Sequence, residues 1–348
     1  MKKYFFYYLF LLTVLVIPAI AQEEGKTLKV YDSQTKSYQN IPIDQSLDSL
    51  DARPPKDILE NSDNMIPATI INGEDWYQVD GNKWPFSAVV YIKGVGKSCS
   101  GSMIGPYTVL TNAHCVYKSF SHNDGTLDDP SSITVFAGRK NSSISARGTR
   151  IYAAPGTNKV SWGTQFMKMD YAIIVLNKPI GNTTGMFGAK GIKVSVGNRI
   201  AVIGFPGKRS YDNPWFSPGE VTSTYQGFFY YNADALPGNS GSPVFLANDL
   251  QNLIALHSFG DDGNGRFNGA TNPSSHALIS FISQYQNEKP SVTDNQDNGL
   301  EQTTRENTTQ EIMDILNQST KTGKTSKENT KQNIIGIFQK SSQKDKKR

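Results

Sequence analysis

The sequence predicts an all-β protein that closes with a single helix, and two patterns support this prediction. From about Thr69 the chain consists of short runs rich in β-branched and aromatic residues, separated by turn-forming residues, as in barrel proteins. Before residue 287, an apolar face recurs at helical spacing after Ser274-Ser275, which can cap a first turn. That face consists of Leu278, Phe281, Ile282 and Tyr285.

The N-terminal residues 1–21 have the pattern of a secretory signal peptide. Lys2 and Lys3 form its charged start, residues 4–17 its apolar run, and Ala19-Ile20-Ala21 a small-residue cleavage site. An apolar run of about 14 residues is short for a bilayer span. We therefore expect a protein that is secreted to the extracellular space without a transmembrane segment.

Residues 22–68 carry nine acidic and five basic side chains and show no sustained apolar periodicity. This pattern predicts a propeptide, or leader, that forms no core of its own. The folded domain is then predicted over residues 69–287, which is long enough for two six-stranded barrels. Its clearest strands are residues 88–92, 133–136, 172–176, 200–205 and 253–256.

The C-terminal residues 288–348 are rich in Lys, Asn, Gln and Thr, and we expect them to form a disordered tail. Residues 321–348 hold nine basic and two acidic side chains, so the basic balance of the chain belongs to this tail. The tail could contact anionic surfaces, whereas the remainder gives no support for nucleic-acid binding. The expected partners are protein or peptide substrates, and we expect a monomer.

Three short segments of the folded domain carry the groups of an acyl-transfer site. His114 precedes a cysteine, Asp170 begins an apolar run, and Ser240 lies in the glycine-rich segment 237–243. Acyl transfer needs a nucleophilic alcohol, an imidazole to take its proton, and a carboxylate to orient the imidazole. Small residues before Ser240 would let the N–H groups of Gly238 and Ser240 converge on an oxyanion. The order His, Asp, Ser is that of chymotrypsin-type barrels.

The two cysteines of the chain are Cys99 and Cys115, and the second directly follows His114. Export makes a disulfide between them plausible. Such a bond would clamp the His114 loop to a neighbouring strand. The four histidines have no ligand spacing, so the sequence predicts neither a metal site nor a cofactor.

Together these motifs resemble the glutamyl endopeptidases, a bacterial branch of the chymotrypsin-like serine proteases, over roughly residues 69–287. The resemblance implies a double six-stranded β-barrel with a C-terminal helix. It also implies that His114 is the general base, Asp170 its orienting partner and Ser240 the nucleophile, with Gly238 and Ser240 forming the oxyanion hole. The matching segments are residues 100–106, 111–117, 170–173, 179–183, 204–207, 238–245 and 256–257.

The same resemblance points to a substrate pocket lined by His257, Ser258 and Gly260. In the family, a histidine at this place contacts an acidic substrate side chain, which implies cleavage after Glu or Asp. Two residues depart from the family pattern. Ala235 stands where a threonine is usual, and Asp234 lies where trypsin-like enzymes hold the aspartate that selects Arg or Lys.

Three functions therefore stay open at the level of sequence. The first is a secreted serine endopeptidase with acidic preference, and the second is the same chemistry with a basic preference set by Asp234. The third is a catalytically silent binding module with a protease fold. Asn239 replaces the aspartate that pairs with the new N-terminus in digestive proteases, so maturation near Thr69 or Ile70 should not form that ion pair.

Overall fold

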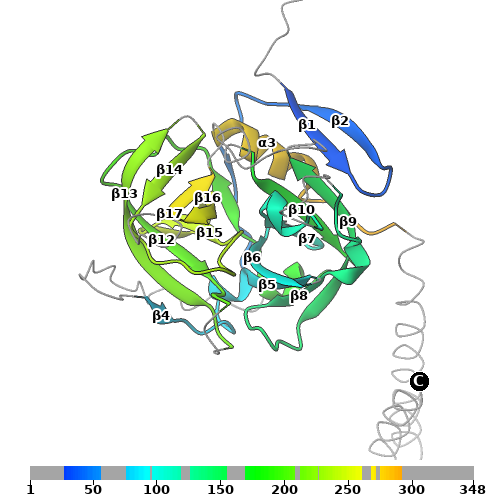
Figure 1. The fold of residues 1–348 in the computed structure, drawn as a ribbon, viewed down its shortest axis with the longest axis horizontal. Coiled ribbons are helices and arrows are strands. Elements are labelled where there is room, and N and C mark those ends of the chain that lie inside the picture. Colours follow the sequence, from blue (N-terminus) through cyan, green and yellow to red (C-terminus); the bar gives the residue numbers. More distant parts are fainter. Residues whose placement is uncertain are drawn as a thin grey trace, which may run out of the picture.

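The computed structural model describes residues 27–55, 76–94, 96–118, 126–154, 169–207, 212–225, 227–260, 268–271 and 275–291, and these ranges form two β-barrels that lie side by side (Figure 1). The predictions of a signal peptide, of a maturation point at Thr69 or Ile70, and of a disordered tail beyond residue 291 lie outside the described residues.

The first barrel is built from six antiparallel strands in the order β10-β7-β6-β5-β8-β9. It closes because β9 also pairs with β10, with Tyr152 opposite Ile173. Closure leaves few exposed strand edges on which the sheet could pair with another chain. The strands are β5 (Val89–Gly94), β6 (Lys97–Met103), β7 (Thr108–Thr111), β8 (Thr134–Ala137), β9 (Ser145–Ala154) and β10 (Tyr171–Leu176).

The second barrel repeats this design in the order β15-β12-β13-β14-β17-β16 and closes through β15 and β16. The strands are β12 (Arg199–Gly204), β13 (Trp215–Tyr225), β14 (Phe228–Tyr231), β15 (Pro243–Leu246), β16 (Asp249–Gly260) and β17 (Asn268–Thr271). Two short strands flank it: β4 (Tyr77–Gln78) pairs with β13, and β11 (Gly188–Lys190) runs parallel to β16. The predicted double six-stranded barrel is thus confirmed.

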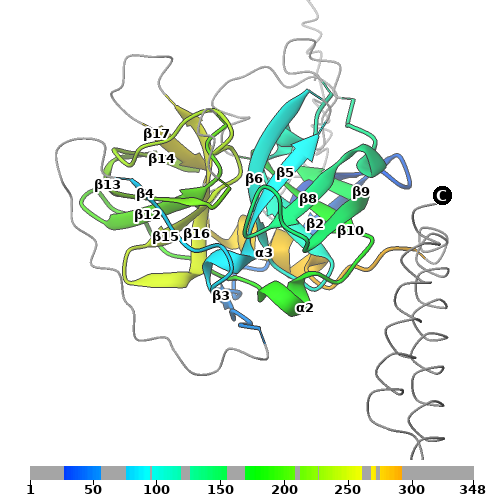
Figure 2. The ribbon, with the colours of Figure 1, turned by 90° about the horizontal axis from the view of Figure 1, so that it is seen from below.

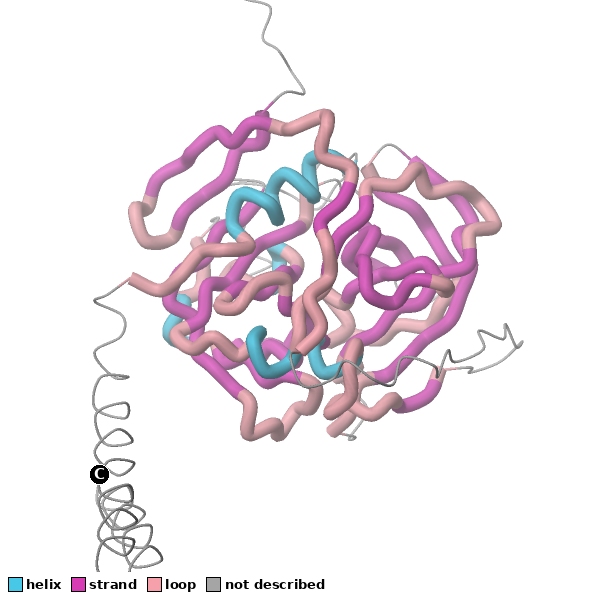
Figure 3. Tube along the Cα trace, turned by 180° about the vertical axis from the view of Figure 1, so that it is seen from behind, coloured by secondary structure: helices cyan, strands magenta, loops and turns pink. Residues whose placement is uncertain are grey.

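The predicted C-terminal helix is also present, as α3 (Ser275–Tyr285). Its apolar face packs on the first barrel, where Phe281 meets Tyr171 edge to face and Tyr285 stacks on Tyr152 with ring centroids 4.0 Å apart. Figure 2 shows α3 at the junction of the two barrels, and Figure 3 shows the same helix from behind. None of the helices in the described ranges is long and apolar enough to cross a membrane.

Only short helical turns occur besides α3 among the described residues. They are η1 (Phe86–Ala88), η2 (Ala113–Cys115), η3 (Pro130–Ser132) and α2 (Gly181–Thr184). The turn η2 directly follows β7 and carries His114, which places this imidazole at the rim of the first barrel.

Residues 27–55, for which the sequence predicted no core of their own, add buried side chains to the core of the first barrel. These residues form β1 (Thr27–Asp32), β2 (Ser37–Pro42) and β3 (Ser49–Leu50), and all three pair with other strands. In β1, Leu28, Val30 and Asp32 alternate inward and are buried. The alternation was hidden in the sequence because its third inward residue is a carboxylate, whose partner Arg150 lies 118 residues away.

Candidate active site

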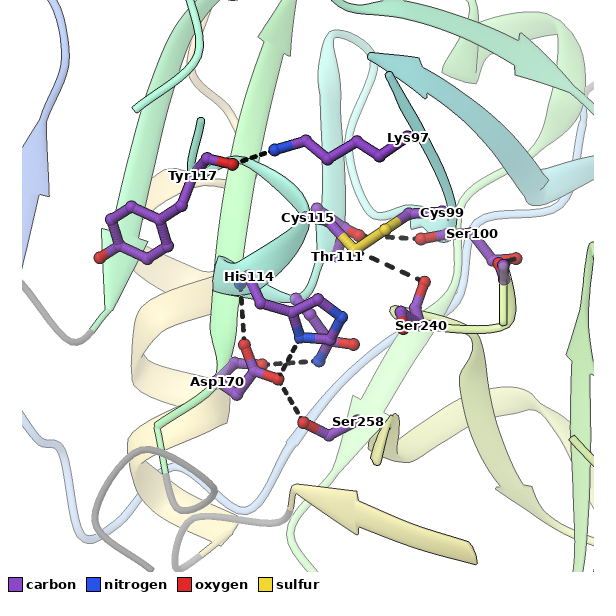
Figure 4. Close-up of a disulfide and its surroundings, with 12 residues drawn as sticks. Lys97, Cys99, Ser100, Thr111, His114, Cys115, Tyr117, Asp170, Ser240 and Ser258 are labelled. Carbon is purple, nitrogen blue, oxygen red and sulfur yellow. Dashed lines mark hydrogen bonds and ion pairs between the residues drawn. A yellow bond between two sulfur atoms is a disulfide. The ribbon is translucent and has the colours of Figure 1, made fainter. Parts of the chain in front are cut away.

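Three side chains from different elements meet at the junction of the two barrels (Figure 4). His114 lies on η2, Asp170 directly precedes β10, and Ser240 lies in the turn before β15. Figure 4 shows the imidazole of His114 between the carboxylate of Asp170 and the turn that carries Ser240. The fold therefore brings together the three residues that the sequence analysis singled out.

Asp170 holds His114 through two hydrogen bonds. The backbone N–H of His114 donates to Oδ1 of Asp170 at 3.0 Å, and Nδ1 of the imidazole lies 2.7 Å from Oδ2. Asp170 is fully buried and the His114 residue is 7% exposed. A buried carboxylate next to Nδ1 keeps the ring proton on that nitrogen, which leaves Nε2 as a proton acceptor.

Asp170 accepts a third hydrogen bond, from the hydroxyl of Ser258 on β16. The side chain of Asn112 adds a bond from Nδ2 to the carbonyl oxygen of Asp170, at 2.7 Å. Ser258 was predicted to bind substrate, but its hydroxyl is directed to Asp170 instead. This contact ties a strand of the second barrel to the carboxylate of the first.

The backbone around Ser240 is turned so that its N–H groups are available. Gly238 has a φ of 106°, a backbone conformation that residues other than glycine rarely adopt. The carbonyls of Pro237 and Ser240 accept bonds from Gly207 N–H at 2.7 Å and Ser100 N–H at 2.8 Å. Within the described part of the chain, the N–H groups of Gly238 and Ser240 have no acceptor. These are the two donors that the sequence predicts for an oxyanion hole.

A second set of contacts fixes this turn to the first barrel. The hydroxyl of Ser100 on β6 donates to the carbonyl of Gly238 at 2.9 Å, and it accepts from Phe205 N–H at 2.8 Å. Ser100 and Asn112 lie in segments that match the family, but their contacts were not predicted, because a serine or asparagine near a strand end gives no signal of its distant partner.

Cys99 on β6 and Cys115 on η2 form a disulfide with their Cα atoms 6.1 Å apart. The bond joins the turn that carries His114 to the neighbouring strand. Among the described residues, Cys99, His114 and Cys115 are the one group of three that has metal-ligand geometry. Because both sulfur atoms belong to the disulfide, this group offers no thiolate to a metal ion.

His257 lies on β16, one residue before Ser258, and is 5% exposed. Its backbone is hydrogen-bonded to the turn that carries Ser240. The N–H of His257 donates to the carbonyl of Ser242, and the carbonyl of His257 accepts from the N–H of Gly241. Its Nδ1 lies 2.5 Å from the hydroxyl of Tyr231 on β14. Burial, with a smaller contribution from His114, lowers the pKa of His257 to about 3, so the imidazole is neutral at ordinary pH.

The other predicted pocket residues lie on the segments that frame His257. Asp234 and Ala235 are half-buried between β14 and Ser240, and Gly260 ends β16 opposite Asn268. Tyr231 was not predicted, because an aromatic residue in a barrel strand most often only fills the core.

The neutral state of buried His257 should make the protein less stable in acid. The unfolded chain protonates His257 near pH 6.5, whereas the folded chain does not until about pH 3. The contribution of His257 to the free energy of unfolding is therefore constant above pH 6.5. It falls as the pH drops below that value, by at most about 1.4 kcal/mol per pH unit. In urea unfolding between pH 7 and 4, the free energy of unfolding should decrease less steeply for His257→Leu than for wild type. Equal slopes would contradict the buried, neutral imidazole.

Comparison with known proteins agrees with this geometry. The profile of the Trypsin family matches residues 75–279. The chain belongs to the trypsin family. Over 215 residues it is 32% identical to a glutamyl endopeptidase of Bacillus licheniformis and 31% identical to a Bacillus subtilis protein named extracellular metalloprotease, each match covering 58% of this chain. These matches span 65% and 66% of the lengths of those relatives.

A solved structure described as a Glu endopeptidase in complex with MPD is also similar. It shares 28% identity with this trypsin-family chain at a TM-score of 0.53, and the match covers 62% of this chain and 98% of that one. The resemblance to the glutamyl endopeptidase branch, predicted from the sequence, is confirmed by these relatives.

Proposed function

We propose that this trypsin-family protein is a secreted serine endopeptidase that prefers Glu, or Asp, before the scissile bond. The observation that supports it most is the 2.7 Å contact of Asp170 with His114 Nδ1, beside a serine turn with two available N–H groups. Residues 1–21 would direct secretion, and a cut near Thr69 or Ile70 would separate the leader from the catalytic region.

In the first half of the reaction, Nε2 of His114 removes the proton of the Ser240 hydroxyl while Oγ attacks the substrate carbonyl carbon. The carbonyl oxygen becomes an oxyanion that accepts hydrogen bonds from the N–H groups of Gly238 and Ser240. The protonated imidazole then gives its proton to the leaving amine as the C–N bond breaks. An acyl-enzyme on Ser240 remains.

The second half repeats these steps with water. His114 takes a proton from the water molecule, the hydroxide attacks the acyl carbon, and the same two N–H groups hold the second oxyanion. The proton then returns through His114 to Oγ of Ser240, which frees the acid product. Throughout, Asp170 fixes the ring orientation and balances the charge of the imidazolium, with Ser258 holding the carboxylate in place.

The proposed acidic preference rests on the tautomer of the neutral His257 ring. Burial raises the pKa of Tyr231 well above its usual value, so its hydroxyl keeps a proton and can donate it to Nδ1 of His257. The ring proton is then on Nε2, which can donate to a substrate carboxylate. A charge-assisted bond of this kind contributes about 1.5–3 kcal/mol. The alternative preference, for Arg or Lys, would require the Asp234 carboxylate to face the substrate.

We expect His257→Leu to lower the preference for Glu over Gln before the scissile bond ten- to hundredfold, because only Glu presents a carboxylate to Nε2. The ratio of kcat/KM for two matched peptides, one with Glu and one with Gln, measures this effect. His276→Leu, on α3, is the control and should leave the ratio unchanged. An unchanged ratio in His257→Leu would mean that His257 does not contact the substrate carboxylate. A dominant preference for Lys or Arg in the wild-type protein would favour Asp234 as the residue that selects the substrate.

Covalent labelling tests the proposed chemistry without any assumption about the substrate. An alkyl fluorophosphonate should form a single covalent adduct, on the hydroxyl of Ser240. Mass spectrometry of the digested protein locates the adduct. Ser240→Ala should not react, and Ser242→Ala, two residues on, should react like wild type. Absence of the Ser240 adduct in matured protein would favour the silent binding module.

A further inference from the structure

The leader strand β1 extends the sheet of the first barrel. It pairs with β9 at Tyr31 and Asp32, and next to this pairing the N–H of Ser33 donates to the carbonyl of Ile151 at 2.9 Å. The hydroxyl of Ser33 in turn accepts from the N–H of Ile151 at 2.7 Å. Backbone bonds of this kind are the ones by which a separate peptide can add a strand to a sheet.

A buried ion pair lies under this strand. The carboxylate of Asp32, which is 3% exposed, accepts from Nε of Arg150 at 2.9 Å and from Nη2 of the same guanidinium. Arg150 also lies 3.8 Å from the carboxylate of Glu288, beyond α3. Paired acceptors on one guanidinium give a contact of defined geometry, and removing one buried partner leaves the other charge uncompensated.

The other end of the leader contacts a different part of the domain. Arg53 and Met186 exchange two backbone hydrogen bonds, both at 2.7 Å, and the guanidinium of Arg53 donates to the carbonyl of Ile104 at 2.9 Å. Nearby, β3 pairs with β11. The surface of the domain fits this backbone closely, because a Cβ on Gly188 would lie 2.2 Å from the carbonyl oxygen of Leu50.

None of the described contacts of residues 27–55 reaches His114, Asp170 or Ser240. The leader covers β9, α3 and β11, and Figure 1 shows β1 and β2 beside α3, on the outside of the first barrel. The described part of the leader therefore makes no contact with the three residues of the proposed triad. Residues 56–75 connect it to the domain in the sequence, so a cut within them severs the covalent link without removing any residue that makes the contacts described above.

We propose that residues 27–55 stay bound after the chain is cut, as a second, non-covalent chain of the mature protein. The proposal rests on the proposed function only for its timing, because the cut belongs to maturation. The leader would then stabilise the first barrel and α3 in the mature protein, and its release would not be needed for activity.

The test uses the full chain with Ser240→Ala, so that peptidase activity plays no part in the outcome. A recognition sequence for a site-specific protease is inserted within residues 56–75, the chain is cut, and the product is separated by size-exclusion chromatography at about 1 µM. We expect the leader peptide to elute with the domain and to leave it only in denaturant. A leader that elutes as a free peptide from a domain with native near-UV circular dichroism would overturn the proposal.

Two variants test whether the described contacts hold the leader. Asp32→Asn and Arg53→Ala should each raise the dissociation constant of the leader at least tenfold, whereas Asn40→Ala, at an exposed position of β2, should leave it unchanged. Circular dichroism of each uncut chain checks that it folds. Equal dissociation constants for all three variants would overturn the part of the proposal that assigns the binding to the contacts of Asp32 and Arg53.

Discussion

Replacing Asp170 by asparagine is expected to lower kcat about ten-thousand-fold while leaving the protein folded. The carboxylate accepts three hydrogen bonds, from the backbone N–H of His114, from Nδ1 of its ring and from Ser258. An amide has only one accepting atom. If its oxygen stays with the backbone N–H, its NH2 group faces Nδ1 and donates to it. The ring proton then moves to Nε2, and the imidazole can no longer take the proton of Ser240.

The measurement is the steady-state kcat for hydrolysis of a peptide substrate by the matured variant. Asp80→Asn is a matched control, because Asp80 is a half-exposed carboxylate in the loop between β4 and η1. The control should retain wild-type kcat. A kcat for Asp170→Asn within tenfold of wild type would mean that the 2.7 Å contact with His114 does not orient a catalytic base.

Loss of the disulfide should have the next largest effect. Cys99 and Cys115 enclose a loop of 16 residues, for which the entropy of the unfolded chain predicts a stabilisation of about 3 kcal/mol. The double variant Cys99→Ser/Cys115→Ser should lower the free energy of unfolding by about this amount. It should also lower kcat, because the bond anchors the turn that carries His114.

Urea unfolding under oxidising conditions measures the first effect, and reduction of the wild-type protein gives an independent comparison. Reduced wild type and the double variant should unfold at similar urea concentrations. If the double variant is as stable as the oxidised wild type, the bond contributes nothing to the fold.

The sequence predicted most of the fold because its signals are local. Apolar runs such as residues 172–176 became β10, in which all six positions are buried, and the helical spacing from Leu278 to Tyr285 became α3. The meeting of His114, Asp170 and Ser240 at one junction was predicted from the order of their motifs and from the resemblance to a known family, not from local pattern. Local patterns suffice where an element's own residues decide its structure.

Contacts between distant residues could not be predicted in this way. Tyr231 and His257 are 26 residues apart on different strands, and only the barrel brings the hydroxyl to Nδ1. The leader strands were missed for the same reason, since Asp32 in β1 appears as an exposed charge until Arg150 is placed beside it. Local pattern predicts a polar residue to be exposed. The prediction is wrong where a partner far along the chain buries that residue.

Mass spectrometry of the peptides released from a mixed, denatured protein substrate tests both the proposed triad and the proposed role of His257 in selecting the bond. The matured protein and its Ser240→Ala variant are compared in parallel. We expect cuts after Glu, with fewer after Asp, and none with the variant. Cuts that persist in Ser240→Ala, or that cluster after Lys and Arg, would contradict the proposed function.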